Sequence, residues 1–194
     1  MSNKIYEKQR NYYASGEPLP WDDVLPPPEV RALIEQRSAD RALDLGCGYG
    51  RTSIYLAQRD WDVDGIDFIE QAVIEARRRA NAANVTPRFH HGDVTKLDFL
   101  TGSYRLAIDV GCAHALNSAE LTQYITHLAR LLHSKADYLL YARLQEAHAE
   151  QTGLDEATLL QQFETQFKLL TIDYGERIDF HAPWKSAWLH FQRR

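Results

Sequence analysis

The sequence is short of cysteine, has no long apolar run and carries no excess of basic residues. Its two cysteines, Cys47 and Cys112, lie too far apart in the chain for a metal knuckle, so we predict reduced thiols and no metal site. Nowhere do about eighteen apolar residues follow one another, as a membrane-spanning helix requires. The first twenty residues also lack the apolar core of a secretion signal. We therefore expect a cytoplasmic protein without a membrane partner.

The charge balance excludes one further class of partner. The chain has 22 Lys and Arg residues against 27 Asp and Glu residues, and this net charge of -5 provides no electrostatic footprint for nucleic acid. With 194 residues, 44% of them hydrophobic, the chain has the size of one globular domain with a sizeable core. We expect it to act as a monomer or a homodimer.

From about residue 41 onward, short apolar runs alternate with helical stretches. This alternation is typical of repeated βαβ units, so we predict an α/β fold with a doubly wound, mostly parallel seven-stranded sheet. Strands are predicted at 41–45, 63–66, 88–91, 106–110, 138–141, 167–174 and 186–191. The last two lack a crossover of helix length between them, which indicates a hairpin and one antiparallel strand.

The segment before Pro28 has a different composition. It reads NYYASGEPLPWDDVLPPP, and its prolines are incompatible with a regular helix through it. We predict that residues 1–27 form an arm or lid on a domain that spans residues 28–194. The aromatic residues Tyr12, Tyr13 and Trp21 either fasten this arm to the domain or offer cation–π contacts to a bound cation.

The stretch ALDLGCGYGR, from Ala42 to Arg51, places three glycines directly after a predicted strand. Glycines at alternate positions let a ligand approach the main chain closely. A P-loop would require Lys after its last glycine, where this chain has Arg51, and a dinucleotide-binding loop has the spacing GxGxxG instead of GxGxG. Asp44, two positions before the first glycine, would repel a pyrophosphate and suits a cationic group such as an ammonium.

Two further acidic residues follow the next two predicted strands. In a doubly wound sheet the carboxyl ends of neighbouring strands border one ligand crevice, so Asp67 in VDGID is expected to accept hydrogen bonds from ribose hydroxyls. Phe68 is then placed to lie against a purine. Asp93 and Val94 in HHGDV are placed to bind adenine, although Gly-Asp is also ordinary turn chemistry.

Four motifs in this order, ALDLGCGYG, VDGIDF, HGDV and YRLAIDVGCAH, resemble those of class I S-adenosylmethionine-dependent methyltransferases over roughly residues 28–194. The resemblance implies a Rossmann-like fold and S-adenosylmethionine as cofactor, with S-adenosylhomocysteine as product. It also implies that Asp109 and Gly111 lie beside the sulfonium. The implied cofactor-binding residues are Asp44, Gly46, Cys47, Gly48, Asp67, Phe68, Asp93, Val94, Asp109 and Gly111.

The arm resembles a narrower group, the small-molecule methyltransferases related to thiopurine, thiol and halide methyltransferases and to tellurite-resistance proteins. Many of these carry Gly-x-Pro-Trp-Asp, where this chain has GEPLPWD, with two extra residues and with Asp23 in place of a common glycine. The resemblance implies a small-molecule acceptor.

The loop after the fourth predicted strand, DVGCAHALN, also borders the crevice. It lacks the Asn/Asp-Pro-Pro-Tyr motif of enzymes that methylate nucleobases or protein amides. His114 is the best-placed general base if the acceptor is an amine or hydroxyl. Asn117 either contacts substrate or caps the next helix. Tyr141 and Arg143, which end the fifth strand, either face the pocket or support it.

The predicted function is methyl transfer from S-adenosylmethionine to a small molecule by in-line displacement. This reaction requires proximity and alignment more than an acid or base, because the cofactor supplies an activated methyl group. The alternative is a protein that binds the cofactor without methyl transfer, as a sensor, scaffold or cyclase. An NAD-dependent oxidoreductase is a third candidate, which the glycine spacing disfavours.

Overall fold

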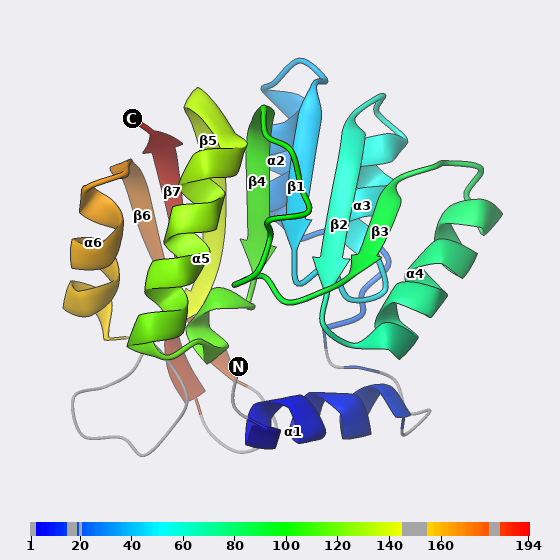
Figure 1. The fold of residues 1–194 in the computed structure, drawn as a ribbon, viewed down its shortest axis with the longest axis horizontal. Helices are drawn as coiled ribbons and strands as arrows, with labels where there is room; N and C mark the ends of the chain where they lie inside the picture. Colours follow the sequence, from blue (N-terminus) through cyan, green and yellow to red (C-terminus); the bar gives the residue numbers. More distant parts are fainter. Residues whose placement is uncertain (1–2, 15–18, 20, 145–154, 179–182) are drawn as a thin grey trace.

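A seven-stranded sheet runs through the centre of the molecule in the order β3-β2-β1-β4-β5-β7-β6 (Figure 1). The structure is a computed structural model, and it describes residues 3–14, 19, 21–144, 155–178 and 183–194. The strands are β1 (Arg41–Leu45), β2 (Asp62–Asp67), β3 (Arg88–His91), β4 (Tyr104–Val110), β5 (Leu132–Arg143), β6 (Phe167–Ile178) and β7 (Pro183–Arg193).

The strands β1 to β5 pair in parallel, whereas β7 runs antiparallel to both β5 and β6. The predicted α/β class, the seven strands, the hairpin and the single antiparallel strand are therefore confirmed. In this register Leu45 of β1 lies between Ile66 of β2 and Asp109 of β4. The carboxyl ends of these three strands are thus level with one another, which brings their terminal side chains to one edge of the sheet.

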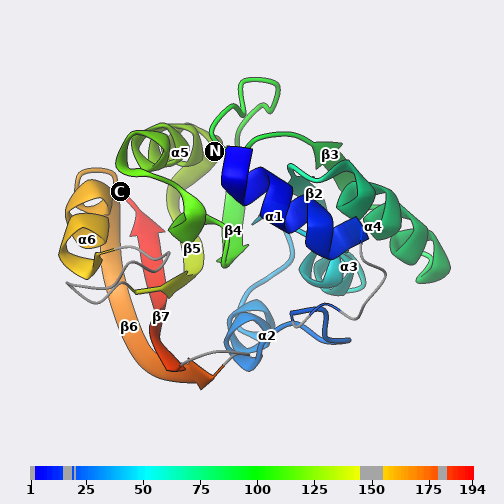
Figure 2. The ribbon, with the colours of Figure 1, turned by 90° about the horizontal axis from the view of Figure 1, so that it is seen from below.

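Helices cover both faces of this sheet (Figures 1 and 2). On one face lie α2 (Pro28–Glu35) and α3 (Arg51–Ala57), on the other lie α5 (Ser118–Leu131) and α6 (Glu156–Glu164), and α4 (Glu70–Ala82) packs beside β3. Leu121, Ile125 and Leu128 of α5 are buried, because their spacing of three and four residues places them on one side of the helix. Among the described residues, no helix is long and apolar enough to span a bilayer.

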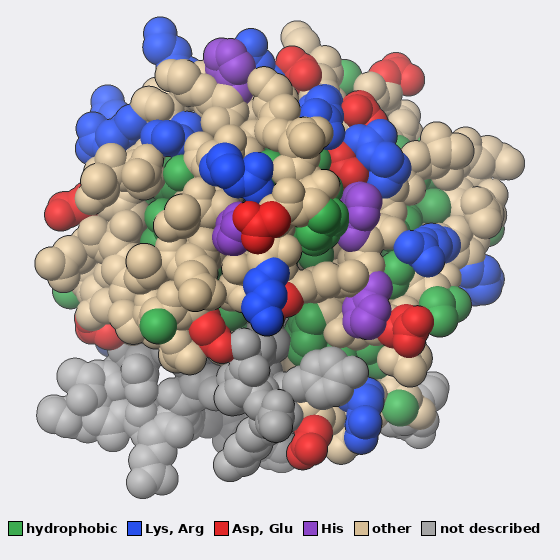
Figure 3. Space-filling model, viewed as in Figure 1, with side chains coloured by type: hydrophobic (Ala, Val, Ile, Leu, Met, Phe, Trp, Pro, Cys, Tyr) green, Lys and Arg blue, Asp and Glu red, His purple; other side chains and the backbone are tan. Residues whose placement is uncertain are grey.

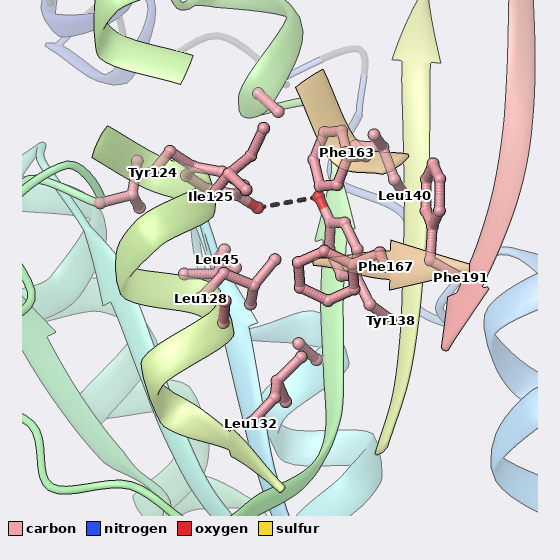
Figure 4. Close-up of a cluster of buried hydrophobic side chains, with 14 of the residues drawn as sticks. Leu45, Tyr124, Ile125, Leu128, Leu132, Tyr138, Leu140, Phe163, Phe167 and Phe191 are labelled. Carbon is pink, nitrogen blue, oxygen red and sulfur yellow. Dashed lines mark hydrogen bonds between the residues drawn. The ribbon is translucent and has the colours of Figure 1, made fainter. Parts of the chain in front are cut away.

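The larger of the two main cores lies beneath α5 and α6 and is rich in aromatic rings (Figure 4). Phe163 of α6 stacks on Phe191 of β7 with 4.9 Å between ring centroids, and Tyr138 of β5 stacks on both. Offset ring pairs of this kind stabilise a core by about 0.5–1.5 kcal/mol beyond the area that they bury. This core holds β7 against β5, the neighbour of β4, and so supports one side of the carboxyl edge.

The N-terminal segment contains a helix, α1 (Asn3–Ala14), that the sequence pattern did not predict. This helix ends at Ala14, before the first proline of the segment, so it does not conflict with the expectation that no regular helix passes through the prolines. Residues 15–18 and 20 lie outside the described residues. Helix α1 lies at the end of the sheet to which the arrows of β1, β2 and β4 point, and seen from below it passes in front of the strands (Figures 1 and 2). This helix therefore lies over the edge at which the acidic residues gather.

Candidate functional site

Three acidic side chains, Asp44, Asp67 and Asp109, meet at the carboxyl edge of the sheet. They come from β1, β2 and β4, three adjacent strands, and they are only 3%, 4% and 0% exposed. Buried carboxylates are rare in proteins unless they are paired or have a function. Within the described residues, none of the three forms a salt bridge. Their closest polar contacts are hydrogen bonds, and the charge of Arg51 adds a favourable interaction at Asp44.

Asp67 fastens the glycine loop to β2. Its carboxylate accepts hydrogen bonds from the backbone N–H groups of Gly48 (2.9 Å) and Ile69 (2.8 Å). Asp44 accepts one from the hydroxyl of Ser53 in α3 (2.6 Å). Ser53 was not predicted from the sequence, because a serine in the first turn of a helix gives no signal of this role.

Asp109 is held by the loop that follows it and by α5. Its carboxylate accepts hydrogen bonds from the N–H groups of Cys112 (2.7 Å) and Ala113 (3.0 Å) and from the Tyr124 hydroxyl (2.8 Å). The Tyr124 hydroxyl also shares a hydrogen bond of 2.9 Å with the hydroxyl of Tyr138 (Figure 4). This chain of buried hydroxyls fixes the carboxylate from below. Neither tyrosine was predicted from the sequence, because both occupy ordinary core positions.

Of the three glycines, two are required by packing within the protein. Gly46 and Gly50 have φ angles of 71° and 81°, which side chains rarely adopt. A Cβ at Gly46 would lie 2.7 Å from the Cβ of Cys112, and one at Gly50 would lie 2.7 Å from the ring of Phe89. Their lack of a side chain therefore serves the contact of the loop with β3 and with the loop after β4.

Gly48 faces the arm instead. Its φ is 54°, and a Cβ there would lie 3.1 Å from the hydroxyl oxygen of Tyr13 in α1. Burial and, next, the charge of Asp67 raise the pKa of Tyr13, which places its hydroxyl close to the acidic cluster. Cys47, beside Gly48, is buried, and burial raises the pKa of its thiol well above the ordinary value.

Aromatic contacts and two ion pairs hold the arm in place. Tyr12 and Tyr13 both lie edge-on to Trp21, at 5.4 Å and 6.3 Å between ring centroids, and Tyr13 also contacts Tyr49 at 5.2 Å. The arm residues Asp22 and Asp23 pair with Arg79 of α4 (2.8 Å) and Arg51 of α3 (3.4 Å). All three predicted arm aromatics thus join one cluster beside the glycine loop.

The residues expected at adenine lie farther along the same edge. Asp93 accepts hydrogen bonds from the N–H (2.9 Å) and hydroxyl (2.7 Å) of Thr95, which is the turn chemistry considered as its alternative role. Val94 is buried and Phe68 is half-buried. The adenine contacts of these residues stay a prediction.

The loop after β4 divides its predicted residues between two roles. Asn117 is exposed and caps α5: its side chain accepts from the N–H of Glu120 (3.0 Å), and Glu120 accepts from the N–H of Asn117 (3.0 Å). His114 is half-buried, and burial, followed by the charge of Arg143, lowers its pKa to about 4. Gly111, with φ of 93°, follows β4 directly.

A family model of the methyltransferase domain matches residues 42–135, from β1 into β5. A curated methyltransferase of Schizosaccharomyces pombe is 29% identical over 103 residues, which cover 53% of this chain and 71% of that protein. The chain is a class I S-adenosylmethionine-dependent methyltransferase. The resemblance that its four motifs indicated is thereby confirmed.

Solved structures share the fold of this methyltransferase. A protein solved in work on the conversion of a disulfide bond into a thioacetal group during echinomycin biosynthesis matches with a TM-score of 0.80 and 22% identity, over 96% of this chain and 92% of that one. TehB from Haemophilus influenzae matches with a TM-score of 0.74 and 16% identity, over 96% of this chain and 67% of that one. Others with this fold hold S-adenosylmethionine or S-adenosylhomocysteine, and one is a cyclase.

S-adenosylmethionine is the cofactor of this methyltransferase, and the acidic edge fits it. The cofactor carries a sulfonium, an ammonium and two ribose hydroxyls, all of which interact favourably with carboxylates. Burial raises the pKa of Asp44 and of Asp67 to about 6 and that of Asp109 to about 7, with hydrogen bonds to Ser53 and to backbone N–H groups partly offsetting it. A cationic ligand would stabilise the ionised forms.

These raised pKa values predict opposite effects of pH on stability and on affinity. In an unfolded chain Asp has a pKa of about 3.9. Between about pH 4 and pH 7 the ligand-free folded protein therefore binds more protons than the unfolded chain does. Its free energy of unfolding consequently falls as pH rises through that range. Cofactor affinity should rise over the same range, because the ionised carboxylates attract the cation. The pKa of Asp137 is lowered to about 2, because burial, which raises it, is outweighed by hydrogen bonds with His190 and Arg37. Asp137 therefore affects stability only below this pH range.

We therefore expect the increase in melting temperature that S-adenosylmethionine causes to be larger at pH 8 than at pH 5.5. Thermal melts with and without cofactor at both values provide the measurement, with Asp109→Asn as the variant in which the difference between the two pH values shrinks. An increase that is constant or larger at pH 5.5 would show that the three carboxylates do not govern binding.

Proposed function

We propose that this methyltransferase transfers the methyl group to a small-molecule acceptor by in-line displacement. The observation that carries the proposal is the position of α1, which crosses the strand ends with the Tyr13 hydroxyl 3.1 Å from the place of a Cβ at Gly48. An edge covered in this way is accessible to a small acceptor and not to a bulky polymer. On the face shown in Figure 3, basic side chains lie among acidic ones instead of forming one broad basic patch.

In this proposal the protein binds the cofactor, aligns it with the acceptor and excludes water. The bound cofactor supplies an activated methyl group, so the protein does not need to activate that group. Asp44, Asp67 and Asp109 hold and orient the cationic and ribose parts of the cofactor, and the arm covers them. Alignment of two reactants in a dry site is the main source of rate in such a displacement.

The experiment is a screen for S-adenosylhomocysteine release. Wild-type protein is incubated with S-adenosylmethionine and separate pools of thiols, phenols, carboxylic acids and amines, and each methylated product is identified by its mass increase. The proposal predicts release that depends on at least one pool. Cofactor binding without release from any pool would favour the alternative, a binding protein or a cyclase-like use of the pocket, for which a solved cyclase of the same fold is a precedent in architecture alone.

A further inference from the structure

One buried hydroxyl at the carboxyl edge has no hydrogen-bond partner among the described residues. It belongs to Tyr141 of β5, which pairs with Val110 of β4, next to Gly111. The ring of Tyr141 lies against that of Trp188 at 5.0 Å between centroids, so the side chain is fixed. A buried hydroxyl without a partner destabilises the protein, and a bound ligand that pairs with it would recover that loss.

The ring of His114 also lies close to Gly111. A Cβ at Gly111 would be 3.2 Å from Cε1 of His114 and 3.9 Å from Cδ1 of Tyr141, so both rings border the position that the missing side chain leaves open. Nδ1 of His114 accepts a hydrogen bond from the backbone N–H of Arg143 (3.4 Å). In a neutral imidazole the other nitrogen then carries the proton, so Nε2 is a donor and not a base.

The charged and uncharged groups along this edge lie on different strands. Towards β1 and β2 lie the carboxylates Asp44 and Asp67, which suit a cation. The carboxylate of Asp109, on β4 between them and β5, accepts hydrogen bonds from the Cys112 and Ala113 N–H groups and from the Tyr124 hydroxyl. Towards β5 lie two uncharged donors, Tyr141 and His114, and the positive charge of Arg143 acts on His114. Donors and positive charge favour a ligand group that carries negative charge.

We propose that Tyr141 and His114 form an acceptor subsite that binds an anionic oxygen or sulfur, so that the substrates are thiols, phenols or carboxylic acids. The proposal rests on the proposed function, which it makes more specific. A lone pair of the anion forms the new bond to the methyl carbon, while the carbon–sulfur bond breaks and its electron pair goes to sulfur. The products are the methylated acceptor and neutral S-adenosylhomocysteine. No proton is released in the displacement, in agreement with a His114 that has no free basic nitrogen.

Binding tests this subsite without turnover. Protein saturated with S-adenosylhomocysteine is titrated calorimetrically at pH 8 with benzoate and thiophenol, and with benzylamine as the cationic counterpart. We expect both anions to bind at least tenfold more tightly than benzylamine. Tyr141→Phe should weaken anion binding by roughly ten- to a hundredfold, the effect of one hydrogen bond to a charged group, while its affinity for S-adenosylmethionine stays within about twofold.

The matched control is Tyr174→Phe, which removes a hydroxyl from an exposed tyrosine of β6 that bonds Glu156 instead. It should change neither affinity. His114→Phe keeps a ring and removes the Nε2 donor, and it should weaken anion binding as Tyr141→Phe does. Equal benzoate affinity in wild type and Tyr141→Phe, preference for benzylamine, or no binding of either anion overturns the subsite. Anion binding that depends on Tyr141 in a protein that releases no S-adenosylhomocysteine would instead count against the proposed function.

Discussion

Replacing Asp67 with alanine is expected to weaken S-adenosylmethionine binding by roughly 1.5–3 kcal/mol, about ten- to a hundredfold in Kd. Two losses contribute. The variant lacks the carboxylate expected to bind the ribose hydroxyls, and it leaves the N–H groups of Gly48 and Ile69 without their buried acceptor. The glycine loop should therefore lose its alignment, although the domain remains folded.

Calorimetric titration gives the affinity, and two further variants separate these losses. Asp67→Asn keeps the shape and one acceptor oxygen but removes the charge, so its affinity should lie between those of wild type and Asp67→Ala. Asp98→Ala removes an exposed carboxylate that lies beside His127 of α5 and should bind as wild type does. An unchanged Kd in Asp67→Ala would remove Asp67 from the ribose role.

The second large effect is expected from the arm. Because α1 covers the site and Tyr13 lies over Gly48, loss of residues 1–19 or Trp21→Ala should lower the methyl-transfer rate by roughly ten- to a hundredfold, the range that misalignment and access of water cost. The melting temperature should fall by less than about 4 °C, which for a domain of this size corresponds to a loss of about 1 kcal/mol in the free energy of unfolding. Rate per folded molecule and melting temperature are measured on the same samples.

An exposed residue of the same helix provides the control for this prediction. Glu7→Ala changes the outer surface of α1 and should leave both quantities as they are. If the arm only fastens the fold, the truncated protein will melt at a much lower temperature while its folded molecules keep full turnover. That outcome would mean that the arm is not a lid.

Much of the fold follows from local pattern. The strands β1 and β3 have the predicted bounds. The first is a short, mostly apolar run before the glycine loop, and the second is a mostly polar run bounded by Pro87 and Gly92. The first part of β5 was missed, since residues 133–135 are exposed and polar and Lys135 has a φ of 65°. The outer ends of β6 and β7 were also missed, because polar residues there are held by pairing with each other. The helix α1 has no strong apolar periodicity, and aromatic contacts with distant residues hold the segment that follows it.

In the candidate site too, some residues could be predicted from local sequence pattern and others could not. The positions of Asp44 and Asp67 follow from strand ends alone, and the sequence predicted that these residues and Asp93 border one crevice. Asp109 was expected there only from the family resemblance. Their partners Ser53 and Tyr124 come from helices, and no spacing rule connects a helix residue to a particular strand end. The glycine motif predicted close approach by a ligand at every glycine, whereas contacts within the protein account for Gly46 and Gly50.

The most direct test of the central claim is a calorimetric titration of the wild-type protein with S-adenosylmethionine, S-adenosylhomocysteine and NAD. Three buried carboxylates at adjacent strand ends should accept ribose and cationic groups and repel a pyrophosphate. The account predicts that both sulfur compounds bind with one molecule per chain and that NAD gives no binding heat. Binding of NAD, with no binding of either sulfur compound, would contradict it.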